Sequence, residues 1–343
     1  MIELVRKHLV GMSPYSSARD EFGELGDEIF LDANESPFES DFNRYPDPYQ
    51  WELKERIGQL KSWQPSQILI GNGSDEILDL LYRAFLEPGK DEILSISPSY
   101  GMYKVLADIS NIKVNYWKLN SDFQLDMSLL KKALNPNVKM IVLCSPNNPS
   151  GNNLNLADML DLANSFDGII VVDEAYINFS DQESLSIYID RYPNIIVVQT
   201  LSKAYGMAGL RIGMAYAQKE IIKILNSIKP PYNVNSLSQK VALTELSNSK
   251  RISKRINKIK KQRTWLLDEL EQIDGIKKVY PSQANFILFE IDKPKYIYDE
   301  LIKKGVVIRD RSSIEGCEGC LRVSIGKKSQ NKAFLTYLKQ LLS

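Results

Sequence analysis

Residues 140–151 read Met-Ile-Val-Leu-Cys-Ser-Pro-Asn-Asn-Pro-Ser-Gly, and residues 169–176 read Ile-Ile-Val-Val-Asp-Glu-Ala-Tyr. Each segment is a short apolar run that ends in polar residues or a turn. Because neither run alternates apolar with polar residues, both read as strands covered on two faces, which is typical of parallel sheets. The polar residues that follow lie where open α/β sheets place their ligands.

The same pattern extends from about residue 68 to residue 217, where apolar runs alternate with helical stretches. This alternation predicts an α/β fold with a mostly parallel, seven-stranded sheet between helices. The expected strands are Ile68–Ile70, Glu92–Ile96, Ile112–Tyr116, Met140–Cys144, Ile169–Val172, Ile195–Gln199 and Arg211–Ala217, and the expected helices are Asp75–Leu86, Tyr100–Ile109 and Asn155–Asn164.

The sequence changes character after Pro230-Pro231. A long helix with one apolar face is expected over Asn248–Ile273. It begins with a basic stretch, which we interpret as a solvated face because acidic residues follow at once. Further elements, which together predict a smaller α+β C-terminal domain, are strands near Lys277–Tyr280, Phe286–Glu290, Val306–Arg309 and Leu321–Ser324, and helices near Lys295–Lys304 and from Gln330. We therefore expect an N-terminal arm (1–30) that packs with the small domain (236–343), and a large domain (31–235).

Composition excludes several functional classes. The 343 residues contain 43 Lys+Arg and 43 Asp+Glu, a balance that argues against a nucleic-acid or membrane-surface binder. No apolar run approaches about 20 residues, and the N-terminus does not resemble a signal peptide, so a soluble cytoplasmic protein is expected. His8 is the only histidine, which rules out a histidine metal cluster. Cys317 and Cys320 lack a second ligand pair, so no metal site is expected.

The richest window is 200–213, Thr-Leu-Ser-Lys-Ala-Tyr-Gly-Met-Ala-Gly-Leu-Arg-Ile-Gly. Lys203 has no acidic neighbour in this window, and burial or nearby cations would lower its pKa so that the neutral amine could attack an aldehyde. Thr200, Ser202 and Arg211 are groups that bind a phosphate ester. An aldehyde with a phosphate ester suggests pyridoxal 5′-phosphate, although a lysine in a glycine-rich surface loop explains the window alone equally well.

Three further motifs supply polar groups at strand ends. Gly73, Ser74 and Asp75 lie in Gly-Asn-Gly-Ser-Asp-Glu, which follows a strand and opens a helix, a favourable position for a phosphate. Asn148, ahead of a proline, can donate a hydrogen bond to a ligand oxygen. Asp173 ends a buried strand, where an unpaired carboxylate would cost several kcal/mol, so a cationic partner is expected.

The order and spacing of these motifs resemble the fold-type I pyridoxal-phosphate enzymes, particularly the class I and II aminotransferases. The resemblance implies that Lys203 binds the cofactor aldehyde and moves the substrate proton, and that Asp173 partners the pyridine nitrogen. It also implies that Asn148 and Tyr176 hold the ring hydroxyl and that Tyr100 stacks on the ring. The implied phosphate site consists of Gly73, Ser74, Asp75, Thr200, Ser202 and Arg211.

Other stretches narrow the resemblance to the histidinol-phosphate aminotransferase family. They are Leu-Asp-Ala-Asn-Glu-Ser-Pro-Phe at 31–38, Arg-Tyr-Pro-Asp-Pro at 44–48, and Arg309 followed thirteen residues later by Arg322. The resemblance implies a homodimer in which Tyr45 reaches the partner subunit's cofactor, and substrate contacts from Tyr15, Arg309 and Arg322. Ser36 and Ser150 depart from the usual asparagine and threonine, and neither departure removes a catalytic group.

The implied reaction is a ping-pong transamination between L-histidinol phosphate and 2-oxoglutarate, which forms imidazole acetol phosphate and L-glutamate in histidine biosynthesis. An aromatic amino acid aminotransferase and a phospho-amino-acid decarboxylase of the same fold remain alternatives. A catalytically silent binding protein on this scaffold is a third alternative, which the joint presence of Lys203, Asp173 and Arg211 argues against.

Overall fold

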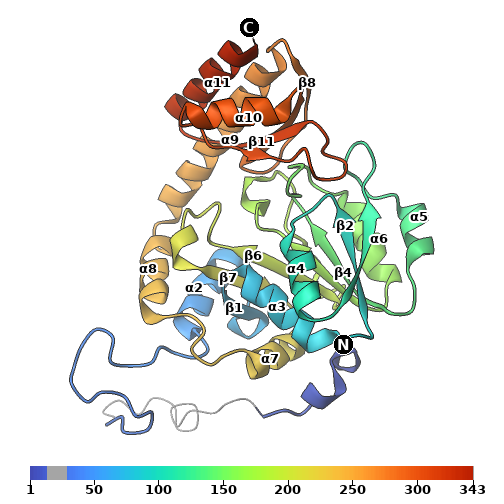
Figure 1. The fold of residues 1–343 in the computed structure, drawn as a ribbon. Coiled ribbons are helices and arrows are strands. Elements are labelled where there is room, and N and C mark those ends of the chain that lie inside the picture. Colours follow the sequence, from blue (N-terminus) through green and yellow to red (C-terminus); the bar gives the residue numbers. More distant parts are fainter. Residues whose placement is uncertain (14–28, 343) are drawn as a thin grey trace.

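The computed structural model describes residues 1–13 and 29–342, and its larger domain is built on one seven-stranded sheet (Figure 1). The strand order is β1-β7-β6-β5-β4-β2-β3, and only β7 runs antiparallel to its neighbours. The predicted mostly parallel α/β sheet is thus confirmed. The strands are β1 (Ile68–Asn72), β2 (Glu92–Ser97), β3 (Lys113–Lys118), β4 (Val138–Cys144), β5 (Ile169–Asp173), β6 (Ile195–Thr200) and β7 (Ile212–Tyr216).

The central strands β4, β5 and β6 are almost entirely buried, as their uninterrupted apolar runs predict. Helices cover the sheet and contribute their apolar faces to its core (Figure 1). The α-helices of this domain are α2 (Trp51–Lys61), α3 (Ser74–Phe85), α4 (Met102–Ile109), α5 (Met127–Ala133), α6 (Leu156–Ser165), α7 (Lys219–Ile228) and α8 (Ser236–Leu246). Short 3₁₀ turns lie at η1 (Ile2–Leu4), η2 (Lys7–Leu9), η3 (Pro65–Gln67), η4 (Ile177–Phe179), η5 (Leu185–Tyr188) and η6 (Ala208–Leu210).

The long helix α9 (Ser249–Glu271) leads from the larger domain into a second, smaller one (Figure 1). Asn248 caps its start by accepting a hydrogen bond from the Arg251 amide at 3.1 Å. A four-stranded antiparallel sheet, in the order β10-β11-β9-β8, has its own apolar core with α9, α10 and α11. The elements are β8 (Ile276–Val279), β9 (Phe286–Ile291), α10 (Pro294–Lys303), β10 (Arg309–Asp310), β11 (Cys320–Ser324) and α11 (Lys328–Leu342).

One predicted strand is largely wrong. The run Val306–Arg309 was expected to be extended throughout, but β10 includes only its last residue and Asp310. After Gly305, the Val306 amide bonds back to the Leu301 carbonyl at 2.9 Å, so this stretch closes the end of α10. β-branched residues favour a strand only where a neighbouring strand offers ladder partners.

The N-terminal residues also differ from expectation. The arm 1–30 was expected to pack with the small domain, yet residues 1–13 lie against the large one. Val5 is buried in its core, and the Arg6 amide bonds to the Ala84 carbonyl of α3 at 2.9 Å. The Arg6 guanidinium also pairs with Glu87 at 3.1 Å, a long-range contact that local sequence does not reveal.

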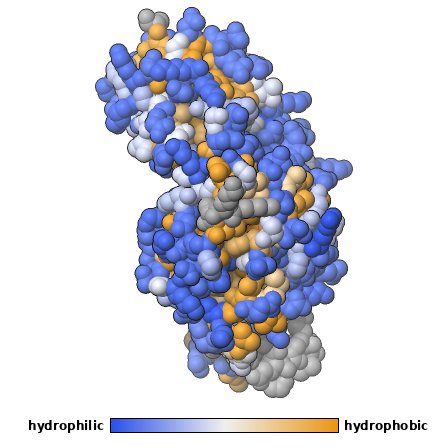
Figure 2. Space-filling model, turned by 90° about the vertical axis from the view of Figure 1, so that its right-hand side faces the viewer, coloured by the Kyte–Doolittle hydropathy of each residue, from blue (hydrophilic) through white to orange (hydrophobic). Residues whose placement is uncertain are grey.

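Seen from the side, the two domains form two lobes with a waist between them, and apolar residues gather on the surface of the larger lobe (Figure 2).

No helix within residues 1–13 and 29–342 combines the length and hydropathy needed to cross a membrane.

Candidate active site

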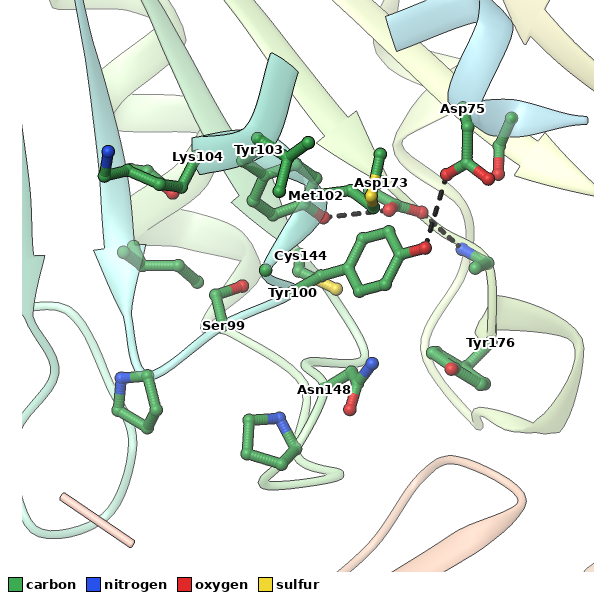
Figure 3. Close-up of a pocket in the computed structure, with 18 of the residues that line it drawn as sticks. Asp75, Ser99, Tyr100, Met102, Tyr103, Lys104, Cys144, Asn148, Asp173 and Tyr176 are labelled. Carbon is green, nitrogen blue, oxygen red and sulfur yellow. Dashed lines mark hydrogen bonds between the residues drawn. The ribbon is translucent and has the colours of Figure 1, made fainter. Parts of the chain in front are cut away.

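A cavity of about 840 Å³ lies between the carboxyl ends of the parallel strands and the β10–β11 pair. Residues from many separate elements face it, as Figure 3 shows for Asp75, Tyr100, Asn148, Asp173 and Tyr176. Of the candidate site residues, those that line it are Ser74, Asp75, Tyr100, Asn148, Asp173, Tyr176, Thr200, Ser202, Lys203, Arg211, Arg309 and Arg322. The structure thus brings together residues that are more than 200 positions apart in sequence.

Asp173 is the last residue of β5, and its carboxylate is buried. It accepts a hydrogen bond from the Tyr103 hydroxyl at 2.8 Å and another from the Ala175 amide at 3.0 Å. Burial raises the pKa of Asp173 to about 6, although these two hydrogen bonds oppose the shift. No cation forms an ion pair with it among the described residues, so the expected cationic partner is not a protein side chain in this part of the chain.

Lys203 follows β6 and directs its amine into the cavity, 5.8 Å from the centre of the Tyr176 ring. Its side chain is exposed, and the sequence alone had left open whether this lysine is buried or lies in a surface loop. The exposure arises because the cavity is open where the strands end. No carboxylate within the described ranges pairs with this amine, so it is available to a ligand.

The residues predicted to form a phosphate cradle meet at the start of α3. Gly73 precedes the helix with φ +82°, and a Cβ atom at this position would lie 2.5 Å from Arg211 Nη2. The absence of a side chain therefore lets the guanidinium lie against the helix start. No side chain caps the first turn, so its amides are available to an anion.

The carboxylate of Asp75 binds protein side chains and is not suited to bind a phosphate. Its carboxylate pairs with Arg211 at 3.5 Å and accepts a hydrogen bond from the Tyr100 hydroxyl at 3.3 Å. A carboxylate would repel a phosphate, so only its backbone amide suits that role. Burial, followed by the charge of Asp75, raises the pKa of Tyr100 to about 12, which keeps this phenol neutral.

Thr200 and Ser202 approach the same cradle from the end of β6. The Thr200 hydroxyl donates to the Ile212 carbonyl at 3.2 Å and lies 3.0 Å from the Ser202 hydroxyl. Thr200 also accepts from the Ser202 amide at 3.1 Å, which fixes the turn that leads to Lys203. Both hydroxyls line the cavity on the side of Arg211.

Asn148 and Tyr176 lie on the opposite side, toward the small domain. Arg322 of β11 donates a hydrogen bond from Nη1 to Asn148 Oδ1 and stacks over the Phe286 ring at 4.9 Å. Tyr176 meets Phe286 edge-on, with ring centres 5.1 Å apart. Arg309 faces Arg322 across the β10–β11 pair, so both predicted substrate arginines enter this cavity.

Two candidates lie elsewhere. Tyr45 stacks on Tyr232, with ring centres 4.4 Å apart, and is about half exposed outside the cavity. Tyr15 lies outside the described residues. The role expected for Tyr45 required a second subunit, and its exposed position is compatible with that role.

Tyr103 and Arg311 are among the cavity residues that sequence reasoning missed. Tyr103 of α4 donates a hydrogen bond to Asp173, and no pattern in the local sequence distinguished it from an ordinary buried tyrosine. Arg311 lines the cavity beside Arg309 and Arg322. The Arg-x-Arg pattern at the end of β10 was the available signal, because residues two apart in a strand share a face.

The burial of Asp173 leads to a prediction for the cofactor-free protein. Its pKa of about 6 exceeds the ordinary value of 3.8, so stability falls as pH rises between these values and stays lower above them. Asp173→Asn removes that loss and should raise the free energy of unfolding near neutral pH by up to about 3 kcal/mol. Urea unfolding across pH measures this, with exposed Asp122→Asn as the control. A variant less stable than the wild type above pH 6 would contradict the assignment.

Comparison with known proteins places the chain in an enzyme family. Residues 29–338 match the family model for aminotransferase class I and II. A histidinol-phosphate aminotransferase of Christiangramia forsetii is 48% identical over 340 residues, which cover 99% of this chain and 97% of the relative.

Two solved structures are similar in fold to this chain. The histidinol-phosphate aminotransferase of Clostridium acetobutylicum has a TM-score of 0.80 at 27% identity, with 88% of this chain and 91% of that one covered. L-threonine-O-3-phosphate decarboxylase of Porphyromonas gingivalis has a TM-score of 0.76 at 27% identity, with coverages of 87% and 90%.

Enzymes of this class use pyridoxal 5′-phosphate, in agreement with the expected cofactor. The chain belongs to the class I and II aminotransferases, among which full-length relatives that are 42–48% identical to it are named histidinol-phosphate aminotransferase.

Proposed function

We propose that this chain transfers the amino group between L-histidinol phosphate and 2-oxoglutarate, which yields imidazole acetol phosphate and L-glutamate. The observation that carries the proposal is the convergence of a free amine (Lys203), a buried carboxylate (Asp173) and two facing arginines (Arg309 and Arg322) on one cavity. The amine and carboxylate suit the cofactor, and the arginines suit anionic substrates. The names of the relatives supply the particular substrates.

The cradle fits the cofactor phosphate. The uncapped first turn of α3, from Ser74 and Asp75, offers amide donors, and Arg211 lies over Gly73 with room only because that residue lacks a Cβ. The hydroxyls of Thr200 and Ser202 face the same space. These groups would hold a phosphate with backbone and charge-assisted hydrogen bonds.

The middle of the cavity fits a pyridine ring. Asp173 is a buried carboxylate that pairs with no cation within residues 1–13 and 29–342, and a protonated ring nitrogen is a cation of suitable size. Tyr103 and the Ala175 amide hold that carboxylate in one orientation. Tyr100 would cover one face of the ring, and Asn148 and Tyr176 would bind its hydroxyl.

The catalytic steps then assign a task to each side chain. When bound, pyridoxal phosphate supplies an aldehyde for the amine and an electron-accepting ring. Lys203 would take the proton from the substrate carbon that bears the amino group and deliver it to the cofactor carbon C4′, and it would move a proton in the reverse direction in the second half-reaction. Asp173 keeps the proton on the ring nitrogen. Arg309 and Arg322 orient the substrates through their anionic groups.

We further propose a homodimer in which Tyr45 serves the partner subunit's site. Residues 29–45 form an extended segment at the edge of the molecule (Figure 1). Its apolar side chains Leu31, Phe38 and Phe42 are 87%, 82% and 65% exposed. A second copy would cover such side chains, and Tyr45 from this segment could then reach a cavity that is not its own.

The substrate assignment is tested by measuring glutamate formation from L-histidinol phosphate and 2-oxoglutarate, beside phenylalanine and O-phosphothreonine as amino donors. We expect turnover chiefly with histidinol phosphate. Lys203→Ala should lower the rate by well over tenfold because it removes both the amine and the proton carrier. Lys219→Ala, an exposed lysine on α7, is the matched control and should leave the rate unchanged.

Two results would count against these assignments. Absence of turnover with histidinol phosphate would refute the substrate and leave the family unchanged. Half-reaction rates of Lys203→Ala within about tenfold of the wild type would refute the role of the lysine.

The cradle is tested by Gly73→Ala. The added methyl would lie 2.5 Å from Arg211 Nη2 and would force a residue with φ +82° into a strained conformation. We expect the dissociation constant for pyridoxal phosphate to rise by about tenfold or more, measured by absorbance titration of the cofactor-free protein. Gly209→Ala, where a Cβ meets no atom within 4 Å, is the control. Unchanged cofactor affinity in Gly73→Ala would refute the cradle.

The shared site is tested by mixing two inactive variants, Lys203→Ala and Tyr45→Ala. If Tyr45 serves the partner, each mixed dimer contains one site with an intact lysine and an intact tyrosine, so activity returns on mixing. If Tyr45 serves its own subunit, every site keeps a defect and mixing restores nothing. Sedimentation of the mixture provides the control for dimer formation.

A further inference from the structure

Three arginines share one face of the β10–β11 pair. Arg309 lies directly opposite Arg322 in the antiparallel register, so their side chains leave the sheet on the same side. The Arg311 amide continues the ladder by bonding to the Cys320 carbonyl at 2.9 Å. Because side chains two residues apart in an extended chain share a face, Arg311 joins the other two, and all three line the cavity.

These guanidiniums have few partners. Within the described residues, their only hydrogen bond joins Arg322 to Asn148. The Nε atoms of Arg311 and Arg322 are buried and have no hydrogen-bond acceptor. Asp310, the acid nearest in sequence, bonds instead to the Ser312 amide at 2.8 Å and to the Ser312 hydroxyl at 2.5 Å.

The three charges also repel one another. Burial, and then the charge of Arg309, lowers the pKa of Arg311. Burial, and then the charge of Arg311, lowers that of Arg322. No carboxylate of the described residues forms an ion pair with these three half-buried or exposed cations, so their mutual repulsion costs free energy that an anionic ligand would recover.

We propose that Arg311 is a specificity-determining residue that makes this site select a phosphate monoester on the substrate. The inference rests on the proposed function and extends it, since Arg309 and Arg322 alone suffice for a carboxylate. A phosphate monoester carries nearly two negative charges near neutral pH and three acceptor oxygens, so it can engage a third guanidinium.

The different shapes of the two substrates support separate roles for Arg311 and for the other two arginines. Glutamate carries a carboxylate directly on the reacting carbon, whereas histidinol phosphate carries its phosphorus beyond a methylene group and an oxygen. Arg322 belongs to the inner strand β11, and Arg311 directly follows the edge strand β10; adjacent strands lie about 5 Å apart. The three guanidiniums are therefore spread along the cavity wall, and Arg311 binds the larger anion, the phosphate group.

The test compares Arg311→Gln with the wild type as holoenzymes, in which the cofactor's own phosphate already fills the cradle at α3. Calorimetry with inorganic phosphate should show affinity weakened by about tenfold or more. The KM for histidinol phosphate should rise as much, while the KM for 2-oxoglutarate and kcat change less than about threefold. Arg255→Gln, which removes an exposed arginine on α9, should change none of these values.

Unchanged phosphate affinity, or equal losses for both substrates, would overturn the inference. Calorimetry with inorganic phosphate does not depend on turnover. An incorrect substrate assignment would instead appear as absent turnover of histidinol phosphate by the wild-type enzyme. Arg311→Lys keeps the charge and loses the planar fork, and it should recover part of the phosphate affinity. Arg311→Gln is uninformative on its own if it loses its cofactor absorbance or has a lower free energy of unfolding. In that case Arg311→Lys is the test, and it must weaken the binding of phosphate more than the binding of 2-oxoglutarate.

Discussion

The backbone ladder that joins β4, β5 and β6 is the constraint on which the site depends. Cys144 pairs with Asp173, and Asp173 pairs with Val198, so the three strands end at nearly the same level. Residues that follow these ends, Asn148 and Lys203 among them, therefore start from fixed points around one cavity. Because the strands are buried on both faces, the sheet holds these starting points rigidly, and the loops only need to span short distances.

Function and stability oppose each other at the end of β5. Asp173 is buried and forms no ion pair with a cation in the part of the chain that the structure describes. Its neighbour Glu174 is buried as well, and burial raises the pKa of Glu174 to about 7. The Glu174 carboxylate accepts hydrogen bonds from the Leu185 backbone amide at 2.6 Å and from the Gln199 side-chain amide at 2.8 Å. Among the described residues, Asp173 accepts hydrogen bonds only from Tyr103 and the Ala175 backbone amide. The difference indicates that one acid serves the fold, whereas the other awaits a ligand.

Much of this arrangement could be predicted from the sequence, because strand ends follow apolar runs. Asp173 and Arg211 were found from short patterns that local chemistry explains. The contact of Arg6 with α3 and the loss of most of the strand before Arg309 could not be found that way, since they depend on partners distant in sequence. The sequence also left open whether Lys203 is exposed, because its exposure depends on the shape of the whole cavity. Sequence thus identified the chemical groups better than their surroundings.

The pairing of β10 with β11 has a consequence for how this gene can vary. The residues between Arg311 and Cys320 form a connection whose ends are joined by a backbone hydrogen bond. Codons can be gained or lost inside that connection without moving Arg309 or Arg322. A single codon inserted within β11 itself would instead turn Arg322 toward the opposite face of the sheet, away from the cavity. Length variation among descendants of this chain should therefore concentrate in the connection and avoid the strand.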